Sequence, residues 1–343
     1  MNSRSEQDIV AGEQSVILKP TGLCNANCKF CYAINFINKA KSVDYLDEKF
    51  IKYIEDNSIK NIILTGGEIT LVPTFLNELC EYAKKKDITV SLVSNLIEIV
   101  NNRNYWKNFF IKYPKLFLTG SYQTDTERCD KVGKKLNQED FLNFVEWYNK
   151  RLKKHLLIIA VLNDNNENSI LTDLYLAKKY KYTLSIERQI GVGKADSEYL
   201  PLKYFKLLNK IIDLGLWKYE KHLRLFVQCG LFDLHYCNFY CKKMVPVIYL
   251  NKRNELIVTG CDHLSTTNND ITLYTKTTPL KKECIFCKYY NLCQGCHITR
   301  KNIKDYEKNN FLNTSIYCEE IKKVFEEFEK KIINIRGKNG KQI

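Results

Sequence analysis

Short apolar runs alternate with longer amphipathic segments from about residue 16 to residue 214 of this 343-residue chain. The apolar runs are mostly β-branched or aliphatic and are bounded by Gly, Asn, Asp or Pro, which is typical of β-strands. They predict six strands, at Val16–Lys19, Ile62–Thr65, Thr89–Ser94, Leu116–Ser121, Leu156–Val161 and Leu184–Glu187.

Helices are predicted between these strands, because the intervening segments carry apolar residues at helical spacing. Asp47 is expected to cap a helix through Asn57, and further helices are expected at Val72–Lys86, Phe141–Leu152 and Ile170–Lys179. Strand–helix alternation repeated six times indicates parallel βα units. Six units are too few for a closed eight-fold barrel, so the α/β fold is an open partial barrel or a doubly wound sheet. Ligand chemistry on either would lie at the C-terminal ends of the strands.

The pattern changes after about residue 216, where the chain becomes irregular and cysteine-rich. Nine of the fourteen cysteines lie between Cys229 and Cys318. Within this region, Val245–Leu250 and Glu255–Val258 flank a four-residue turn and predict a hairpin. A loop-rich segment of this size needs additional stabilisation, which metal centres can supply.

A terminal helix is predicted at Cys318–Ile335, ahead of a polar tail. The expected organisation is a barrel domain at residues 14–215 and a cysteine-rich domain at residues 216–335, with tails at 1–13 and 336–343. Neither internal repeats nor low-complexity tracts interrupt it.

Fourteen cysteines are too many for an ordinary cytosolic enzyme and too dilute for a small disulfide-stabilised secreted domain. The N-terminus has no apolar signal-peptide core, and no run of about 18 apolar residues predicts a membrane span. We therefore expect a cytoplasmic protein without a membrane partner, whose cysteines serve metal binding or catalysis. The net charge of +14 permits a nucleic-acid partner, but scattered lysines favour a solvated surface instead.

Three cysteines, Cys24, Cys28 and Cys31, lie in KPTGLCNANCKFCY directly after the first predicted strand. Three closely spaced thiolates suit three irons of a [4Fe–4S] cluster and leave the fourth iron open. An open metal position can bind a substrate or co-substrate. Zinc is the alternative, but it usually takes four Cys or His ligands, and no local fourth ligand follows in the sequence.

The second predicted strand ends in LTGGEIT, which contains Gly66, Gly67 and Glu68. Glycines at a strand end let a ligand approach the backbone closely, and Glu68 can accept hydrogen bonds from an ammonium group. A plain strand-to-helix turn would explain the same residues. Because this segment follows the cysteine loop by one βα unit, both are expected at the same end of the sheet.

The combination of CNANCKFCY and TGGE resembles the radical S-adenosylmethionine (SAM) superfamily. The resemblance implies a partial (β/α)6 TIM-like barrel, in which Cys24, Cys28 and Cys31 hold a [4Fe–4S] cluster whose open iron chelates SAM. Reductive cleavage of SAM then gives a 5′-deoxyadenosyl radical, which abstracts hydrogen from the substrate. A reductant such as flavodoxin or ferredoxin is expected to supply the electron.

The same resemblance implies SAM-binding residues at the strand ends. Gly66, Gly67 and Glu68 are expected at the amino group of SAM. Tyr32 is expected at the adenine, and Asn95 and Ser121 are expected at the ribose or methionyl part. Capping or turn roles explain Asn95 and Ser121 equally well. Arg128 is a candidate for the SAM carboxylate, although a surface position accounts for it as well. The stretch ERQIGVGKA, residues 187–195, resembles a segment that passes near the adenosine.

A second cysteine group lies in CIFCKYYNLCQGC, with the spacing C-x2-C-x5-C-x2-C. The five-residue gap is too short for a zinc ribbon. With its surrounding cysteines, the run resembles the SPASM domain, an extension of radical SAM enzymes that mature peptides, although its last gap is one residue shorter than usual. The resemblance implies two auxiliary [4Fe–4S] clusters, which makes three in total.

Two fully ligated auxiliary clusters need eight thiolates. The resemblance implies an inner cluster held by Cys237, Cys241, Cys261 and Cys296. It implies an outer cluster held by Cys284, Cys287, Cys293 and Cys318. Cys229 is an alternative to Cys237 at the inner cluster. Cys80 lies on a helical apolar face and is expected in the core.

Asp262 directly follows Cys261. It resembles an aspartate that deprotonates the substrate in sulfatase-maturing relatives, which makes it a candidate general base. A turn residue that bonds its own loop is the alternative interpretation.

The leading functional hypothesis is a radical SAM enzyme that modifies a peptide or protein oxidatively, for example by crosslinking. Only about 13 residues precede the barrel, so we expect any leader recognition elsewhere in the chain or on a separate leader-binding protein. A small-molecule dehydrogenase and a formylglycine-type sulfatase maturase are the enzymatic alternatives. A non-enzymatic iron–sulfur or zinc regulator that binds nucleic acid is the alternative from another class.

Overall fold

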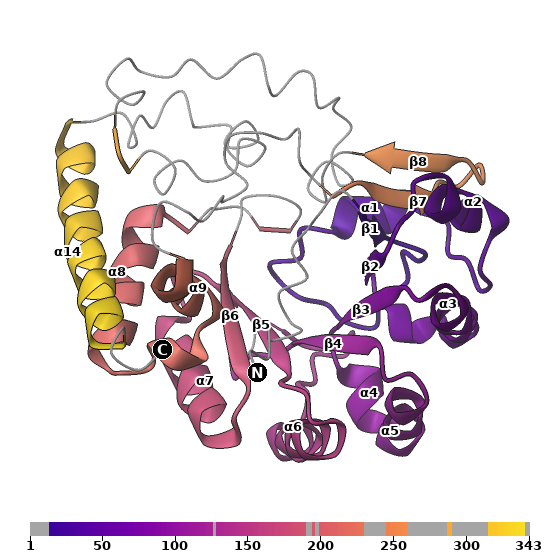
Figure 1. The fold of residues 1–343 in the computed structure, drawn as a ribbon, viewed down its shortest axis with the longest axis horizontal. Helices are drawn as coiled ribbons and strands as arrows, with labels where there is room; N and C mark the ends of the chain where they lie inside the picture. The colour runs from indigo at the N-terminus through magenta and orange to yellow at the C-terminus, as the bar shows by residue number, and fades with distance from the viewer. Residues whose placement is uncertain are drawn as a thin grey trace.

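The computed structural model describes residues 14–125, 128–189, 194–195, 199–229, 245–259, 287–289 and 315–339. Its centre is an eight-stranded sheet with the order β6-β5-β4-β3-β2-β1-β7-β8 (Figure 1). The strands are β1 Ser15–Leu18, β2 Asn61–Leu64, β3 Thr89–Ser94, β4 Leu116–Ser121, β5 Leu157–Leu162, β6 Thr183–Arg188, β7 Val247–Leu250 and β8 Leu256–Thr259.

Helices connect the parallel strands and follow them in the chain. The described α-helices are α1 Ile34–Lys39, α2 Glu48–Asp56, α3 Pro73–Lys86, α4 Ile97–Asn101, α5 Arg103–Lys112, α6 Gln138–Leu152, α7 Glu167–Tyr180, α8 Pro201–Asp213, α9 Lys221–Cys229 and α14 Ser315–Asn339. Two short 3-10 helices, η1 and η2, lie at Ile69–Leu71 and Trp217–Tyr219. None of the helices in the described ranges is long and apolar enough to cross a membrane.

Strands β1 to β6 run parallel, and each pairs with the next in chain order. This sequential order excludes a doubly wound sheet, in which the strand order reverses at a switch point. The sheet curves from β1 to β6, and helices α3 to α7 cover its outer side (Figure 1). The predicted α/β fold, a partial (β/α)6 barrel, is therefore confirmed.

The bounds of the six predicted barrel strands are confirmed to within one residue. Asp47 caps α2 as expected, because its Oδ1 accepts a hydrogen bond from the Lys49 N–H at 2.9 Å. Five of the described α-helices had no counterpart in the sequence prediction, namely α1, α4, α5, α8 and α9.

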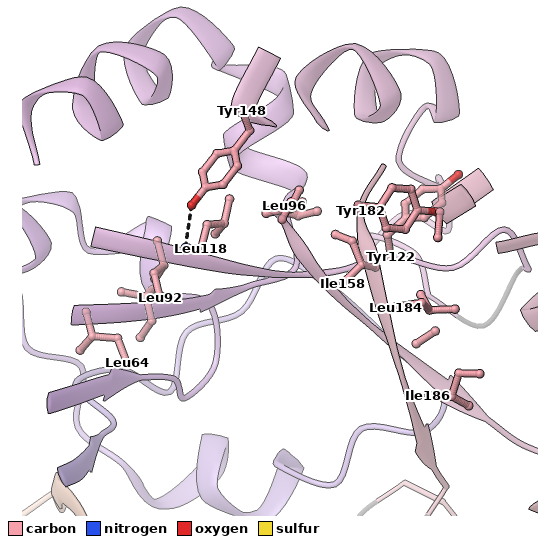
Figure 2. Close-up of a cluster of buried hydrophobic side chains, with 14 of the residues drawn as sticks. Leu64, Leu92, Leu96, Leu118, Tyr122, Tyr148, Ile158, Tyr182, Leu184 and Ile186 are labelled. Atoms are coloured by element: carbon pink, nitrogen blue, oxygen red, sulfur yellow. Dashed lines mark hydrogen bonds between the residues drawn. The ribbon is translucent and has the colours of Figure 1, made fainter. Parts of the chain in front are cut away.

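Alternate side chains of the strands point toward the outer helices and form the buried core. Leu92 and Leu118 pair in register on this side, and Ile158 of β5 is also buried there. Leu92 and Leu118 lie beneath Tyr148 of α6, whose hydroxyl accepts a hydrogen bond from the Leu118 N–H at 3.1 Å (Figure 2). The intervening strand residues face the concave side of the sheet, and many are only partly buried. The concave side is therefore the side on which a ligand has room.

The predicted hairpin is confirmed as β7 and β8, which pair antiparallel. Its turn is closed by Asn251, whose N–H donates to the Glu255 carbonyl at 3.1 Å, and Asn254 takes the left-handed conformation at φ +62°. The sequence did not indicate where the hairpin goes. It continues the barrel sheet, because β7 pairs parallel to β1 with Ile17 opposite Val247.

The terminal helix α14 packs along α8 and α9. The ring centroid of Phe205 lies 4.7 Å from that of Phe325 and 5.1 Å from that of Phe328, and the Lys331 ammonium lies 2.7 Å from the Asp213 carboxylate. The helix continues past Ile335 to Asn339, so residues 336–339 are helical rather than part of a tail. Residues of α9 and α14 share one hydrophobic core with the barrel, and the domain boundary at residue 215 stays a prediction.

Candidate functional site

The loop after β1 carries the three clustered cysteines, and its base is held against the end of β2. The Gly67 N–H donates to the Thr21 carbonyl at 3.0 Å, and the Glu68 N–H donates to the Leu23 carbonyl at 2.6 Å. A Cβ at Gly67 would lie 2.0 Å from the Leu23 oxygen, and Gly66 has φ +143°. Glycine is needed at these positions because the backbone of the cysteine loop packs directly against the end of β2. Their expected contact with SAM stays a prediction.

Glu68 is 1% exposed and joins the C-terminal ends of β2 and β3. Its Oε1 accepts hydrogen bonds from the Ser94 hydroxyl at 2.8 Å and from the Thr70 hydroxyl and N–H at 2.7 and 3.2 Å. Its Oε2 accepts one from the Asn95 N–H at 2.7 Å. Burial raises the pKa of Glu68, although these four donors lower it in part. The geometry therefore makes Glu68 a residue that positions two strand ends.

Asn95 connects the end of β3 to the cysteine loop. Its Nδ2 donates to the Asn25 Oδ1 at 2.7 Å and lies 4.0 Å from the Cys24 Sγ. Its Oδ1 accepts a hydrogen bond from the Ile97 N–H at 3.0 Å, at the start of α4. The structure thus brings the predicted residues Cys24, Glu68 and Asn95 into one hydrogen-bonded assembly.

Cys24, Cys28 and Cys31 are free thiols of intermediate exposure. Burial raises the pKa of the Cys24 thiol to about 11, and burial likewise raises that of Cys31. The positive charges of Lys194 and Arg128 act on Cys31 in the opposite direction. Thiols held in a partly buried loop beside two cations suit an anionic iron–sulfur cluster, because such clusters are bound by thiolates.

Arg128 lies against the cysteine loop rather than on the open surface. Its Nη1 is 3.8 Å from the Cys28 Sγ, and its guanidinium carbon lies 5.0 Å from the centroid of the Phe30 ring. Its Nε is buried without a hydrogen-bond partner. The sequence left the position of Arg128 open, because nothing local shows that residues 128–130 pair with residues 26–27. That pairing is made by the Asn27 N–H, which donates to the Cys129 carbonyl at 2.8 Å.

A small cavity opens beside this assembly at the ends of β3 and β4. It is lined by Asn95, Ile97, Ser121, Tyr122, Gln123, Arg128, Cys129 and Leu136. Two of the expected SAM-binding residues, Asn95 and Ser121, therefore face a common space. The aromatic ring of Tyr32 lies near Lys19, whose Nζ is 6.0 Å from the ring centroid and whose side chain is buried. Sequence reasoning gave no role to Lys19, which has no motif around it.

Within the described ranges, no three His, Cys, Asp or Glu side chains are grouped in a way that would hold a metal ion. A cube places each thiolate on a different iron, so the three cysteines need not surround one ion. Cys80 is 4% exposed within α3, as expected of a core residue, and burial raises its pKa to about 12.

Most of the predicted auxiliary ligands lie outside the described residues. Cys287 and Cys318 are free and partly exposed, whereas the other six, and Asp262, lie outside the described residues. Cys229 ends α9. The two auxiliary clusters and the role of Asp262 stay predictions.

The family comparison agrees with the cysteine loop and its neighbours. Residues 18–175 match the family model described as the radical SAM superfamily. This part of the chain is a radical SAM domain. The family implies a [4Fe–4S] cluster and SAM as cofactors, and an enzyme rather than a purely structural protein.

Among proteins of known function, the radical SAM domain is similar to a 7-carboxy-7-deazaguanine synthase from Clostridium acetobutylicum. The two are 28% identical over 170 residues, which cover 48% of this chain and 74% of that protein. Among solved structures, the chain is similar to Streptococcus suis SuiB bound to its precursor peptide SuiA, with a TM-score of 0.56, 15% identity, and coverage of 86% of this chain and 74% of SuiB. SuiB bound to S-adenosylmethionine matches with a TM-score of 0.55, 15% identity, and coverage of 86% and 75%. At this identity, the likeness to SuiB shows a shared fold.

Proposed function

We propose that this protein cleaves SAM reductively to a 5′-deoxyadenosyl radical and uses it to abstract hydrogen from a peptide or protein. The observation that carries the proposal is the assembly in which Glu68 and Asn95 hold the ends of β2 and β3 against the loop of Cys24, Cys28 and Cys31. The cluster, when bound, supplies the electron that cleaves SAM. The product would be an oxidative modification of the substrate, such as a crosslink.

The roles of the residues follow from where they lie. Cys24, Cys28 and Cys31 would hold the cluster, and Arg128 would place a positive charge beside it. Asn95 and Ser121 line the adjacent cavity, where they can donate hydrogen bonds to SAM. Gly66, Gly67 and Glu68 would present the end of β2 to the amino group, mainly through backbone atoms, because the Glu68 carboxylate already accepts four hydrogen bonds.

Two observations support a peptide substrate. The fold extends over 86% of this chain in the comparison with SuiB, which has been solved with a precursor peptide bound. The C-terminal cysteines also resemble a SPASM domain, and an auxiliary cluster near the substrate could accept an electron from a substrate radical. This electron transfer would make the modification a net oxidation.

A second candidate is the modification of a small molecule. It is favoured by the 28% identity with 7-carboxy-7-deazaguanine synthase. The two candidates differ in the class of molecule that the enzyme modifies. A short peptide encoded beside this protein's own reading frame, and converted by it, would favour the first candidate. A heterocyclic small molecule that stimulates SAM cleavage would favour the second.

The proposed chemistry is tested by anaerobic reconstitution with iron and sulfide, followed by SAM and dithionite. We expect 5′-deoxyadenosine by liquid chromatography and about 12 Fe per chain, four for each of three cubes. A variant with Cys24, Cys28 and Cys31 all changed to Ala should lose about 4 Fe and all SAM cleavage, since it keeps only the auxiliary ligands. Cys80→Ala removes a thiol from the core and is the matched control. It should keep the wild-type iron content and SAM cleavage. Intact clusters without 5′-deoxyadenosine would refute the proposed function.

A further inference from the structure

Glu187 is the only acidic residue in the six parallel strands. Its neighbours Leu184 and Ile186 in β6 are buried in the core (Figure 2). Because side chains alternate along a strand, Glu187 and Ser185 lie on the opposite, concave side. The Glu187 side chain is 48% exposed there, at the C-terminal end of β6.

The described polar contacts of Glu187 use one of its two carboxylate oxygens. The Ser185 hydroxyl donates to Oε1 at 2.8 Å, and the Nε2 of His222 lies 3.6 Å from the same oxygen. Burial alone would raise the pKa of Glu187. The charges of His222 and Lys221 and the hydrogen bond from the Ser185 hydroxyl lower it by more, so the pKa lies below its usual value. The carboxylate is therefore ionised at neutral pH.

His222 is fixed from behind by Glu220. The Nδ1 of His222 lies 3.1 Å from the Glu220 Oε1 and 3.4 Å from the Tyr204 hydroxyl. Glu220 is completely buried and also accepts the N–H groups of Ile186 at 3.2 Å and Leu223 at 2.6 Å. Burial alone would lower the pKa of His222. The negative charges of Glu220 and Glu187 raise it by more, so the pKa lies above its usual value. His222 thus lies between the buried carboxylate of Glu220 and the half-exposed carboxylate of Glu187.

The end of β6 is joined to the cysteine loop by the chain that follows it. Lys194, seven residues after Glu187, donates its N–H to the Cys31 carbonyl at 3.0 Å and its ammonium to the Asn27 Oδ1 at 2.5 Å. Glu187 and the three cysteines therefore lie at the same end of the barrel, where a substrate would approach SAM.

We propose that Glu187 binds a cationic nitrogen of the substrate, an ammonium or guanidinium group, and so orients a peptide on the concave side of the barrel. This inference rests on the proposed function, because it takes the concave side as the substrate site. An ionised carboxylate that is 48% exposed is a strong acceptor for N–H donors. It is a poor general base at neutral pH, because an efficient base has a pKa near the working pH. His222 acts as a positioning residue, since it holds the carboxylate through Oε1.

The test measures binding of three peptides to the reconstituted full chain by anaerobic equilibrium dialysis. The first is acetyl-Gly-Lys-Gly amide, the second has the same sequence with an acetylated lysine side chain, and the third is Gly-Gly-Gly amide with a free amino terminus. We expect the first to bind about tenfold more tightly than the second, as one charge-assisted hydrogen bond allows. Preference for the third over the second would assign the cation to an amino terminus instead of a side chain.

Glu187→Gln should bind the first and second peptides equally, because it keeps the shape and loses the charge. Glu139→Gln, an exposed carboxylate on the outer helix α6, is the matched control and should keep the tenfold preference. Equal binding of all three peptides by the wild type, or an undiminished preference in Glu187→Gln, would overturn the inference.

SAM cleavage by the wild type without peptide is measured in parallel. If the wild type forms no 5′-deoxyadenosine while the charge preference persists and depends on Glu187, the proposed function fails and the cation site stands. If SAM is cleaved but the peptides bind without preference, the proposed function stands and the cation site fails.

Discussion

Two glutamates at the C-terminal ends of barrel strands, Glu68 after β2 and Glu187 in β6, have opposite environments. Glu68 is 1% exposed, accepts four hydrogen bonds and has a raised pKa. Glu187 is 48% exposed, has its described contacts on one oxygen and has a lowered pKa. The same residue type at equivalent ends of a sheet can therefore position backbone or bind a ligand, and the neighbouring donors decide which.

The largest effect is expected from Glu68→Ala. The change leaves the Ser94 hydroxyl, the Thr70 groups and the Asn95 N–H without their acceptor inside the core, so the free energy of unfolding should fall by about 4 kcal/mol. Thermal unfolding monitored by circular dichroism under anaerobic conditions measures it. Glu187→Gln is the matched comparison, and an equal loss in the two variants would remove the distinction between the two glutamates.

Gly67→Ala is expected to cost about 3 kcal/mol, because a Cβ would lie 2.0 Å from the Leu23 carbonyl oxygen. The clash displaces the base of the cysteine loop, so the iron content should fall with the unfolding midpoint. Gly337→Ala in α14 is the control, since nothing lies within 4 Å of its Cβ, and alanine should slightly stabilise the helix. A variant at Gly67 with full iron and unchanged stability would contradict the described packing.

A third carboxylate, Asp173 in α7, shows how burial changes a carboxyl pKa when few hydrogen-bond donors are nearby. Its Oδ1 has no hydrogen-bond partner, its Oδ2 accepts one from the Thr124 N–H at 3.4 Å, and burial raises its pKa to about 7. A raised carboxyl pKa contributes stability that is complete below the unfolded-state value and is lost as the pH rises toward 7. Asp173→Asn should remove this dependence and raise the free energy of unfolding at pH 8 by about 2 kcal/mol.

The measurement is a series of unfolding midpoints between about pH 4 and pH 8, where Asp173 changes its charge. Glu139→Gln on the surface of α6 should leave the pH dependence of the wild type in place. Identical pH profiles for Asp173→Asn and the wild type would show that the burial of this carboxyl has no energetic consequence.

The smallest effect is expected from Glu187→Gln on stability, below about 0.5 kcal/mol, because the side chain is half exposed and the Ser185 hydroxyl keeps an acceptor. Its effect should instead be on the binding of cationic peptides. A loss of stability comparable to that of Glu68→Ala would show that Glu187 serves the fold rather than a ligand.

Much of the barrel could be predicted from local sequence. The β-branched runs gave β1 to β6 to within one residue, and Asp47 marked the start of α2, because strand patterning and capping depend on neighbouring residues. The break between α4 and α5 and the attachment of β7 to β1 could not be predicted this way. The attachment of β7 to β1 depends on a contact between distant segments, that of Ile17 with Val247.

The candidate site divides in the same way. Cys24, Cys28 and Cys31 stand out through their spacing, and Glu68 through its place at a strand end. Arg128 stayed ambiguous, because its position depends on a backbone pairing with Asn27 a hundred residues earlier in the sequence. Glu187 stood out only as the first residue of a stretch expected near the adenosine, and His222 carries no motif. The alternation of β6 and the position of α9 bring the two together.

The pairing of β7 with β1 has a consequence for local opening. Strand β1, which leads into the cysteine loop, is an interior strand, held by β2 on one side and by β7 on the other. The Ile17 and Lys19 N–H groups donate to the Pro246 and Ile248 carbonyls at 2.8 and 2.9 Å. Fraying of β1 therefore breaks two ladders at once, and its amides should exchange with solvent only through larger opening events. The anchor of the cysteine loop is protected from the small fluctuations that affect an edge strand.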